Sequence, residues 1–167
     1  MVSPPYESDV KSVVGVSPPP IGLAYLASVL RDKHDVKVLD ANGLGYGLDD
    51  VRRELKKFYP DVVGITSVTP SIYQAYQVAK IAKEVREDCK VIVGGPHATF
   101  LPDKTLLECG FIDIIVRGEG EETIRELAEA LEKGEWEAVK GITFRKGERI
   151  ISSKSRPFIK ILMKFRF

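Results

Sequence analysis

The amino-acid sequence predicts a doubly wound α/β domain with a mostly parallel sheet and a β-hairpin at its C-terminal end. Short runs of β-branched residues alternate with helical patterns at a pitch of roughly two dozen residues, as in repeated βα units. The runs lack polar alternation, which is typical of strands that helices cover on both faces. With 167 residues, 44% of them hydrophobic, the chain can form one domain with a sizeable core.

The parallel strands are predicted from four apolar runs. These are residues 36–39, 62–66, 91–93 and 114–116. A doubly wound sheet normally begins with a strand before its first helix, and only residues 1–3 or 12–16 could supply it. We therefore expect the inner strand to be short or displaced.

Helices are predicted where apolar residues recur on one face. The segments with this pattern are 48–58, 72–85 and 124–131. Asp49 and Asp50 suit the first turn of the first segment, where the helix dipole favours negative charge. Gly134 should end the last segment as a left-handed cap.

An earlier helix is predicted over residues 21–31, after Pro20, which suits a first helical turn. This segment is apolar nearly all round, so we expect it to be deeply buried.

The C-terminal region departs from the βα pattern. Residues 141–145 and 149–151 flank Lys146-Gly147-Glu148 and predict an antiparallel hairpin. The last residues mix apolar and basic side chains without an obvious partner in the domain. We therefore divide the chain into a domain over 1–157 and a tail over 158–167, the tail being a candidate contact surface.

The composition disfavours several classes of function. Twenty-five basic and 24 acidic residues give a formal charge of +1, which argues against nucleic acid as a partner. No apolar run is long enough to cross a bilayer, so no membrane partner is expected. Cys89 and Cys109 form no ligand-spaced pair, and we expect inert thiols in a reducing cytoplasm. Abundant Lys and Glu point to a thermophile.

Three strand ends carry small, hydrogen-bonding residues. They are Ser67-Val68-Thr69-Pro70, Gly94-Gly95-Pro96-His97 and Arg117-Gly118-Glu119-Gly120-Glu121. In open parallel α/β sheets, ligands bind outside the carboxyl ends of the strands. These ends are therefore predicted to border one ligand crevice.

Five blocks, in the right order, resemble the cobalamin-binding domain that precedes the catalytic barrel of class B radical S-adenosylmethionine enzymes. The blocks are residues 18–27 (PPPIGLAYLA), 36–40, 63–67 with Thr69-Pro70, 93–99 (VGGPHAT) and 116–121 (VRGEGE). The resemblance extends to about Pro157. It implies a Rossmann-like sheet in flavodoxin-like strand order, with a non-covalently bound corrinoid over the carboxyl edge and its nucleotide tail between strands and helices.

The resemblance also implies a set of site residues. Hydroxyls in the first turn would bond the tail and lower edge of the cofactor, paired glycines would line the slot for the tail, and the third turn would border the tail or ring rim. The predicted cobalamin-binding residues are Ser67, Thr69, Pro70, Gly94, Gly95, Pro96, His97, Gly118, Glu119 and Gly120.

Three departures from related patterns limit the expected activity. No Asp-x-His-x-x-Gly is present and the histidines are His34 and His97, so cobalt is expected to lack a protein histidine ligand. No Cys-x-x-x-Cys-x-x-Cys is present, so the iron–sulfur cluster and the catalytic residues should belong to a radical S-adenosylmethionine domain, for which another chain is a candidate. The basic ending at 159–167 suggests a truncated, split or frameshifted relative.

Other interpretations of the same residues remain open. Gly94-Gly95-Pro96 is also compatible with a simple tight turn, His97 with a loop hydrogen bond, and Glu119, Glu121 and Glu122 with charge stabilisation at a helix N-terminus. The alternative function is a degenerate Rossmann-like interaction module without a cofactor. A phosphoacceptor receiver is nearly excluded, because Thr66-Ser67 stands where its aspartate is required.

Overall fold

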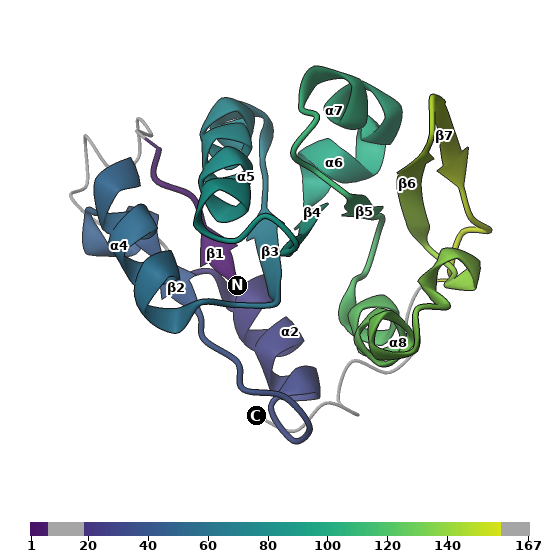
Figure 1. The fold of residues 1–167 in the computed structure, drawn as a ribbon, viewed down its shortest axis with the longest axis horizontal. Helices are drawn as coiled ribbons and strands as arrows, with labels where there is room; N and C mark the ends of the chain where they lie inside the picture. The colour runs from purple at the N-terminus through teal and green to yellow at the C-terminus, as the bar shows by residue number, and fades with distance from the viewer. Residues whose placement is uncertain (7–18, 158–167) are drawn as a thin grey trace.

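The computed structural model describes residues 1–6 and 19–157, which form a seven-stranded sheet in the order β2-β1-β3-β4-β5-β6-β7 (Figure 1). The first five strands are parallel, and β6 and β7 join antiparallel. The strands are β1 (Val2–Ser3), β2 (Leu39–Asp40), β3 (Val62–Thr66), β4 (Lys90–Gly94), β5 (Ile114–Val116), β6 (Ile142–Lys146) and β7 (Arg149–Ser152). The predicted mixed sheet in flavodoxin-like order is confirmed.

Helices cover both faces of this sheet. In Figure 1, α2 and α8 lie below it, and α5, α6 and α7 lie above it. The helices are α2 (Ile21–Leu30), α3 (Ala41–Leu44), α4 (Leu48–Phe58), α5 (Ile72–Val85), α6 (Pro96–Phe100), α7 (Pro102–Glu108) and α8 (Glu121–Lys133). The short 3₁₀ segments are η1 (Thr69–Ser71) and η2 (Trp136–Ala138).

The first strand pair is shorter than the apolar runs suggested. Residues 1–3 supply the inner strand, as one of two expected sources; the other, 12–16, lies outside the described residues. The ladder between β1 and β2 runs over two residues and is extended by Leu39 N–H donating to the Met1 carbonyl. Because β1 offers so little backbone, residues 36–38 do not form strand, and the expected strand over 36–39 shrinks to Leu39–Asp40.

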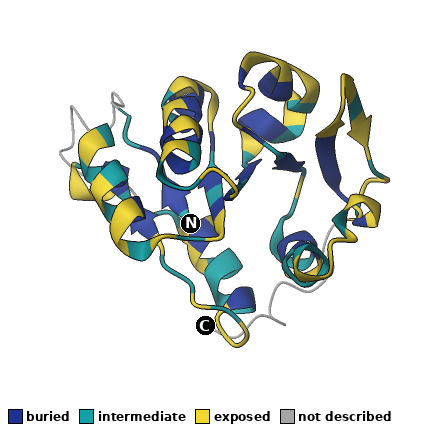
Figure 2. Cartoon of the chain, viewed as in Figure 1, coloured by how far each residue is buried: buried dark blue, intermediate teal, exposed yellow. Residues whose placement is uncertain are grey.

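Two apolar clusters make the core, one on each face of the sheet (Figure 2). The larger joins β3 and β4 to α4 and α5, and the smaller joins β5 and β6 to α2 and α8. The expectation that the apolar helix α2 is deeply buried was wrong. Only Leu23 and Leu30 of this helix are buried, and Ile21 is 59% exposed. One side of α2 packs on the domain, and the rest is left uncovered by the described residues.

Local signals place the helix ends where the sequence indicated. Asp50 accepts a hydrogen bond from the Gly47 N–H, and this bond, with Arg53 nearby, lowers the pKa of the Asp50 carboxyl. Gly134 ends α8 with a φ of 73°, as predicted. None of the helices in the described ranges is both long and apolar enough to span a bilayer.

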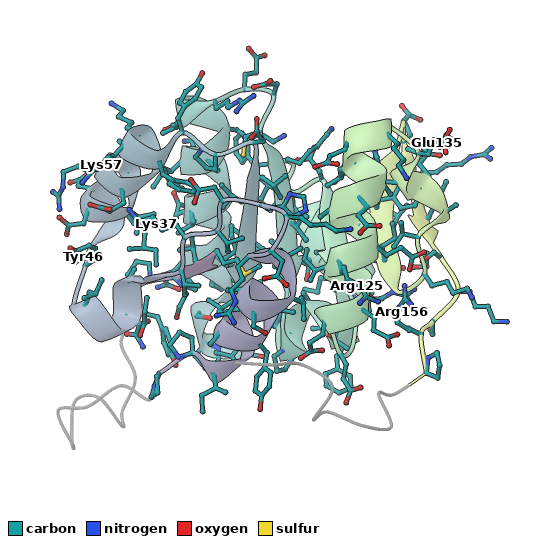
Figure 3. All side chains as sticks on the ribbon, turned by 90° about the horizontal axis from the view of Figure 1, so that it is seen from below. Lys37, Tyr46, Lys57, Arg125, Glu135 and Arg156 are labelled. Carbon is teal, nitrogen blue, oxygen red and sulfur yellow. The ribbon has the colours of Figure 1, made fainter. Side chains whose placement is uncertain are left out.

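The C-terminal hairpin is confirmed and is fixed to the domain. β6 pairs with β5, so the hairpin extends the sheet. After β7, the side chain of Arg156 lies against α8 (Figure 3), where it forms ion pairs with Glu122 and Glu126 and donates to the Thr123 hydroxyl. These contacts hold the end of the described chain on α8.

Candidate functional site

The turns that follow β3, β4 and β5 are joined by hydrogen bonds at one edge of the sheet. Ser67 donates to the Gly94 carbonyl from both its N–H and its hydroxyl, each at 2.9 Å, and the His97 N–H donates to the Ser67 carbonyl at 3.3 Å. The Gly118 N–H donates to the Thr99 hydroxyl at 3.0 Å. The three predicted turns are therefore neighbours at the carboxyl ends of their strands.

Gly95 allows the first two turns to approach so closely. Its φ is 92°, a conformation that other L-residues rarely adopt, and an added Cβ would lie 2.6 Å from the Ser67 carbonyl oxygen and 2.9 Å from the Ser67 nitrogen. A side chain at this position would push the β3 and β4 turns apart.

A cleft of about 270 Å³ opens beside these turns, between the sheet and helices α2 and α8. It contains more than half of the predicted site. The predicted residues that line it are Gly94, Gly95, Pro96, Gly118, Glu119 and Gly120.

The other predicted residues lie beside the cleft without lining it. Ser67 is completely buried, and its hydroxyl is bonded to the Gly94 carbonyl, so it holds the turns together. Thr69 and Pro70 are exposed in η1. The buried His97 has its Nδ1 3.1 Å from the Thr69 hydroxyl. The structure therefore groups His97 and Thr69 with each other rather than with the cleft.

Sequence reasoning missed much of the cleft wall. The additional lining residues are Met1, Gly22, Leu23, Leu26, Gly64, Ile65, Thr66, Ile92, Val116 and Ile124, together with Glu121, which belongs to the third predicted turn but is not among the ten predicted binding residues. Two signals could have indicated them. A glycine inside a strand, such as Gly64, often marks a close approach, and the all-round apolar character of α2 could have indicated a ligand-facing side.

The titratable side chains that line the cleft are Glu119 and Glu121. Across the described ranges, no group of three or more His, Cys, Asp and Glu could hold a metal ion. Cys89 and Cys109 are buried, and burial raises the pKa of both thiols. The partly buried His34 has its Nδ1 3.6 Å from a carboxylate oxygen of Glu132 on α8, and neither residue lines the cleft. The rest of the lining is mostly apolar side chains and glycine backbone.

Doubly wound domains typically bind their ligands at the carboxyl edge of the sheet, where strand order reverses, and here the reversal lies between β1 and β3. Comparison with known proteins identifies the ligand class. Residues 7–128 match the family model described as B12 binding domain. The chain belongs to the B12-binding domain family, which confirms the resemblance found in the sequence and cobalamin as the cofactor of the family.

Similar proteins include two longer enzymes. An uncharacterized methyltransferase of Pyrococcus horikoshii is 48% identical over 160 residues, which cover 95% of this chain and 35% of that protein. An anaerobic magnesium-protoporphyrin IX monomethyl ester cyclase of Rubrivivax gelatinosus is 36% identical over 168 residues, covering 96% of this chain and 30% of that protein. The chain thus spans about a third of the length of these relatives.

A solved structure shares the fold. It is the radical S-adenosylmethionine methyltransferase TsrM from Kitasatospora setae, with cobalamin and a 4Fe-4S cluster bound. It aligns with a TM-score of 0.75 at 20% sequence identity, over 99% of this chain and 30% of that one. The domain therefore has the same fold as part of that enzyme.

Proposed function

We propose that this chain binds cobalamin non-covalently, with the nucleotide tail in the cleft and the corrin ring over the carboxyl edge of the sheet. The observation that carries the proposal is the cleft itself, which two strand glycines keep open. Gly64 on β3 and Gly94 on β4 both line it. Gly94 pairs with Thr66, which lies two residues after Gly64 on β3, so the two glycines lie on the same face of the sheet.

The size and lining of the cleft fit a flat aromatic base. Its volume of about 270 Å³ lies just below the roughly 300–1,000 Å³ of typical small-molecule sites. It could hold the tail of cobalamin but not the whole corrinoid, so the ring would remain outside. Leu23 and Leu26 on α2, with Ile92 on β4, offer apolar contacts to the base.

The turns would satisfy the polar groups of the cofactor. Thr66 lines the cleft, and the glycine-rich turns after β4 and β5 place their backbone beside it. Hydroxyl and N–H groups can bond amide and phosphate oxygens without a net charge. We keep the ten predicted residues as the proposed site, with Ser67, Thr69, Pro70 and His97 supporting the rim.

Cobalt is proposed to have no protein histidine below it. The segment between β1 and α2, residues 4–20, contains no histidine. His97 does not line the cleft, and its ring is bonded to Thr69. With its base in the cleft, cobalamin would be bound base-off. Cobalamin supplies a cobalt centre that can carry a methyl group, and this chain would bind and orient it.

Catalysis would then belong to a radical S-adenosylmethionine domain, in the same protein or on another chain. The relatives named above support this, since each is about three times the length of this chain. The sequence contains no Cys-x-x-x-Cys-x-x-Cys to hold an iron–sulfur cluster. We propose residues 1–157 as the cofactor domain and 158–167 as a tail outside the described residues. A reducing cytoplasm fits the two free cysteines, and a heat-adapted source fits the Lys- and Glu-rich composition.

Hydroxocobalamin provides the direct test. The purified protein is incubated with it, desalted and examined by visible absorption, with an equal amount of an unrelated protein as the control for trapped cofactor. Retained corrinoid absorbance in proportion to protein supports binding. A spectrum no different from the control would overturn the proposal and favour the interaction module without cofactor.

A further inference from the structure

We propose that Glu121 recognises the corrinoid by accepting a hydrogen bond from an uncharged O–H or N–H donor. This inference rests on the proposed function and adds a recognition residue to the same cleft. Glu121 is the first residue of α8 and lines the cleft.

The carboxylate of Glu121 has an unsatisfied oxygen in that position. Its Oε2 is buried and has no hydrogen-bond partner among the described residues. Within that part of the chain, Gln74, His97 and Arg117 also have such an atom, but none of them lines the cleft. Glu121 therefore combines an unsatisfied acceptor with a place in the ligand site.

A helix-dipole role does not explain this placement. Glu121 and Glu122 both lie in the first turn of α8, where negative charge stabilises the helix. The Glu122 carboxylate is 3.5 Å from Arg156 and does not line the cleft. Glu122 can provide the same dipole stabilisation with a satisfied side chain, whereas burying an acceptor without a donor is unfavourable. The free-energy cost of burying the Glu121 acceptor is offset if a ligand supplies the donor.

The chemistry of a carboxylate limits what that donor can be. A phosphate diester has no proton to donate and repels a carboxylate, so the tail phosphate is excluded as the partner. The ribose hydroxyls of the nucleotide tail and the amide N–H groups on the corrin rim are uncharged donors. Cobalamin has both kinds of donor, whereas a corrinoid without the nucleotide keeps the ring amides and lacks the ribose hydroxyls.

The test compares two corrinoids and three variants. Binding of hydroxocobalamin and of cobinamide, which lacks the nucleotide base and ribose, is titrated with wild type, Glu121→Ala, Glu121→Gln and Glu122→Gln. Hydrogen bonds to charged groups are strong enough that Glu121→Ala should weaken cobalamin binding about 10-fold or more. Glu121→Gln retains a weaker neutral acceptor and should lose about fivefold. Glu122→Gln should bind like wild type.

The comparison of hydroxocobalamin with cobinamide identifies the donor. If Glu121→Ala weakens cobalamin but leaves cobinamide unchanged, the donor is a ribose hydroxyl. If it weakens both equally, the donor is a ring amide. Unchanged or tighter cobalamin binding by both Glu121 variants would overturn the inference.

Thermal unfolding of the cofactor-free protein provides a second readout. Because Glu121 is unsatisfied without ligand, Glu121→Gln should have a Tm no lower than that of Glu122→Gln, which loses an ion pair. A purely structural role for Glu121 requires the opposite order. If wild type itself retains no cobalamin, the proposed function fails. If wild type binds and the Glu121 variants bind equally well, only this inference fails.

Discussion

Filling the cleft at Gly94 should abolish tight cobalamin binding while leaving the fold intact. A Cβ at Gly94 would lie 3.5 Å from the Val116 carbonyl oxygen, an ordinary van der Waals distance. Gly94 also lacks the positive φ that excludes other residues. Gly94→Val therefore adds a β-branched side chain to a strand that can accept it, but places an isopropyl group in the proposed tail site.

The expected effects on folding and on binding differ in size. Replacing a strand glycine changes the free energy of unfolding by about 1 kcal/mol at most and in the stabilising direction. An aromatic base buries roughly 150–250 Å², worth about 4–6 kcal/mol at 25 cal/mol/Å². Losing half of that contact costs about 2–3 kcal/mol, or an affinity about 30- to 150-fold weaker.

The assay combines a hydroxocobalamin titration with urea unfolding of the cofactor-free protein. Gly110→Val is the matched control, because a Cβ there meets nothing within 4 Å and Gly110 does not line the cleft. We expect Gly94→Val to remain folded and to bind hydroxocobalamin about 30- to 150-fold more weakly, and Gly110→Val to bind it like wild type. Near-wild-type binding by a folded Gly94→Val protein would refute the placement of the tail.

Three further predictions concern the fold around the site. Gly95→Ala should lower the free energy of unfolding by about 3 kcal/mol, because it adds a backbone clash to the strain of a positive φ. Gly118→Ala has free space around its Cβ and should lower it by only about 1–2 kcal/mol. Equal urea midpoints for the two variants would contradict this. Cys89 and Cys109, 1% and 4% exposed with pKa values raised by burial, should react with a thiol reagent only after unfolding, and fast labelling of the native protein would be inconsistent with the structure. Burial lowers the pKa of the Met1 amino group to about 6. Between pH 6 and 8 the unfolded chain therefore binds more protons than the folded protein, and the free energy of unfolding should rise by about 2 kcal/mol over that range. N-terminal acetylation should remove this rise.

Most of the sheet could be predicted from the sequence because its strands are short β-branched runs between helical patterns. β3, β4 and β5 appear where the runs predicted them, and so does the hairpin after α8. The exposure of α2 was not predictable from its composition. Apolar residues all round a helix indicate what the helix can contact, but not whether a core or an open cleft provides the contact.

Part of the cleft wall could be predicted from the sequence because turn chemistry is local. The glycines at the ends of β4 and β5, which the sequence predicts to lie in turns, line the cleft. Ser67 shows the limit of such reasoning, since a hydroxyl in a sequence does not reveal its partner, and here the partner is the Gly94 carbonyl. Gly64 and Leu26 were missed because they meet at the cleft only after α2 has packed on the sheet.

The most direct test of this account is the electron paramagnetic resonance spectrum of the chain loaded with cob(II)alamin. With the nucleotide base in the cleft and no histidine below cobalt, the cobalt hyperfine lines should show no splitting from an axial nitrogen. Three-line nitrogen splitting on those hyperfine lines would mean that the base or a histidine is bound to cobalt, and would contradict the account.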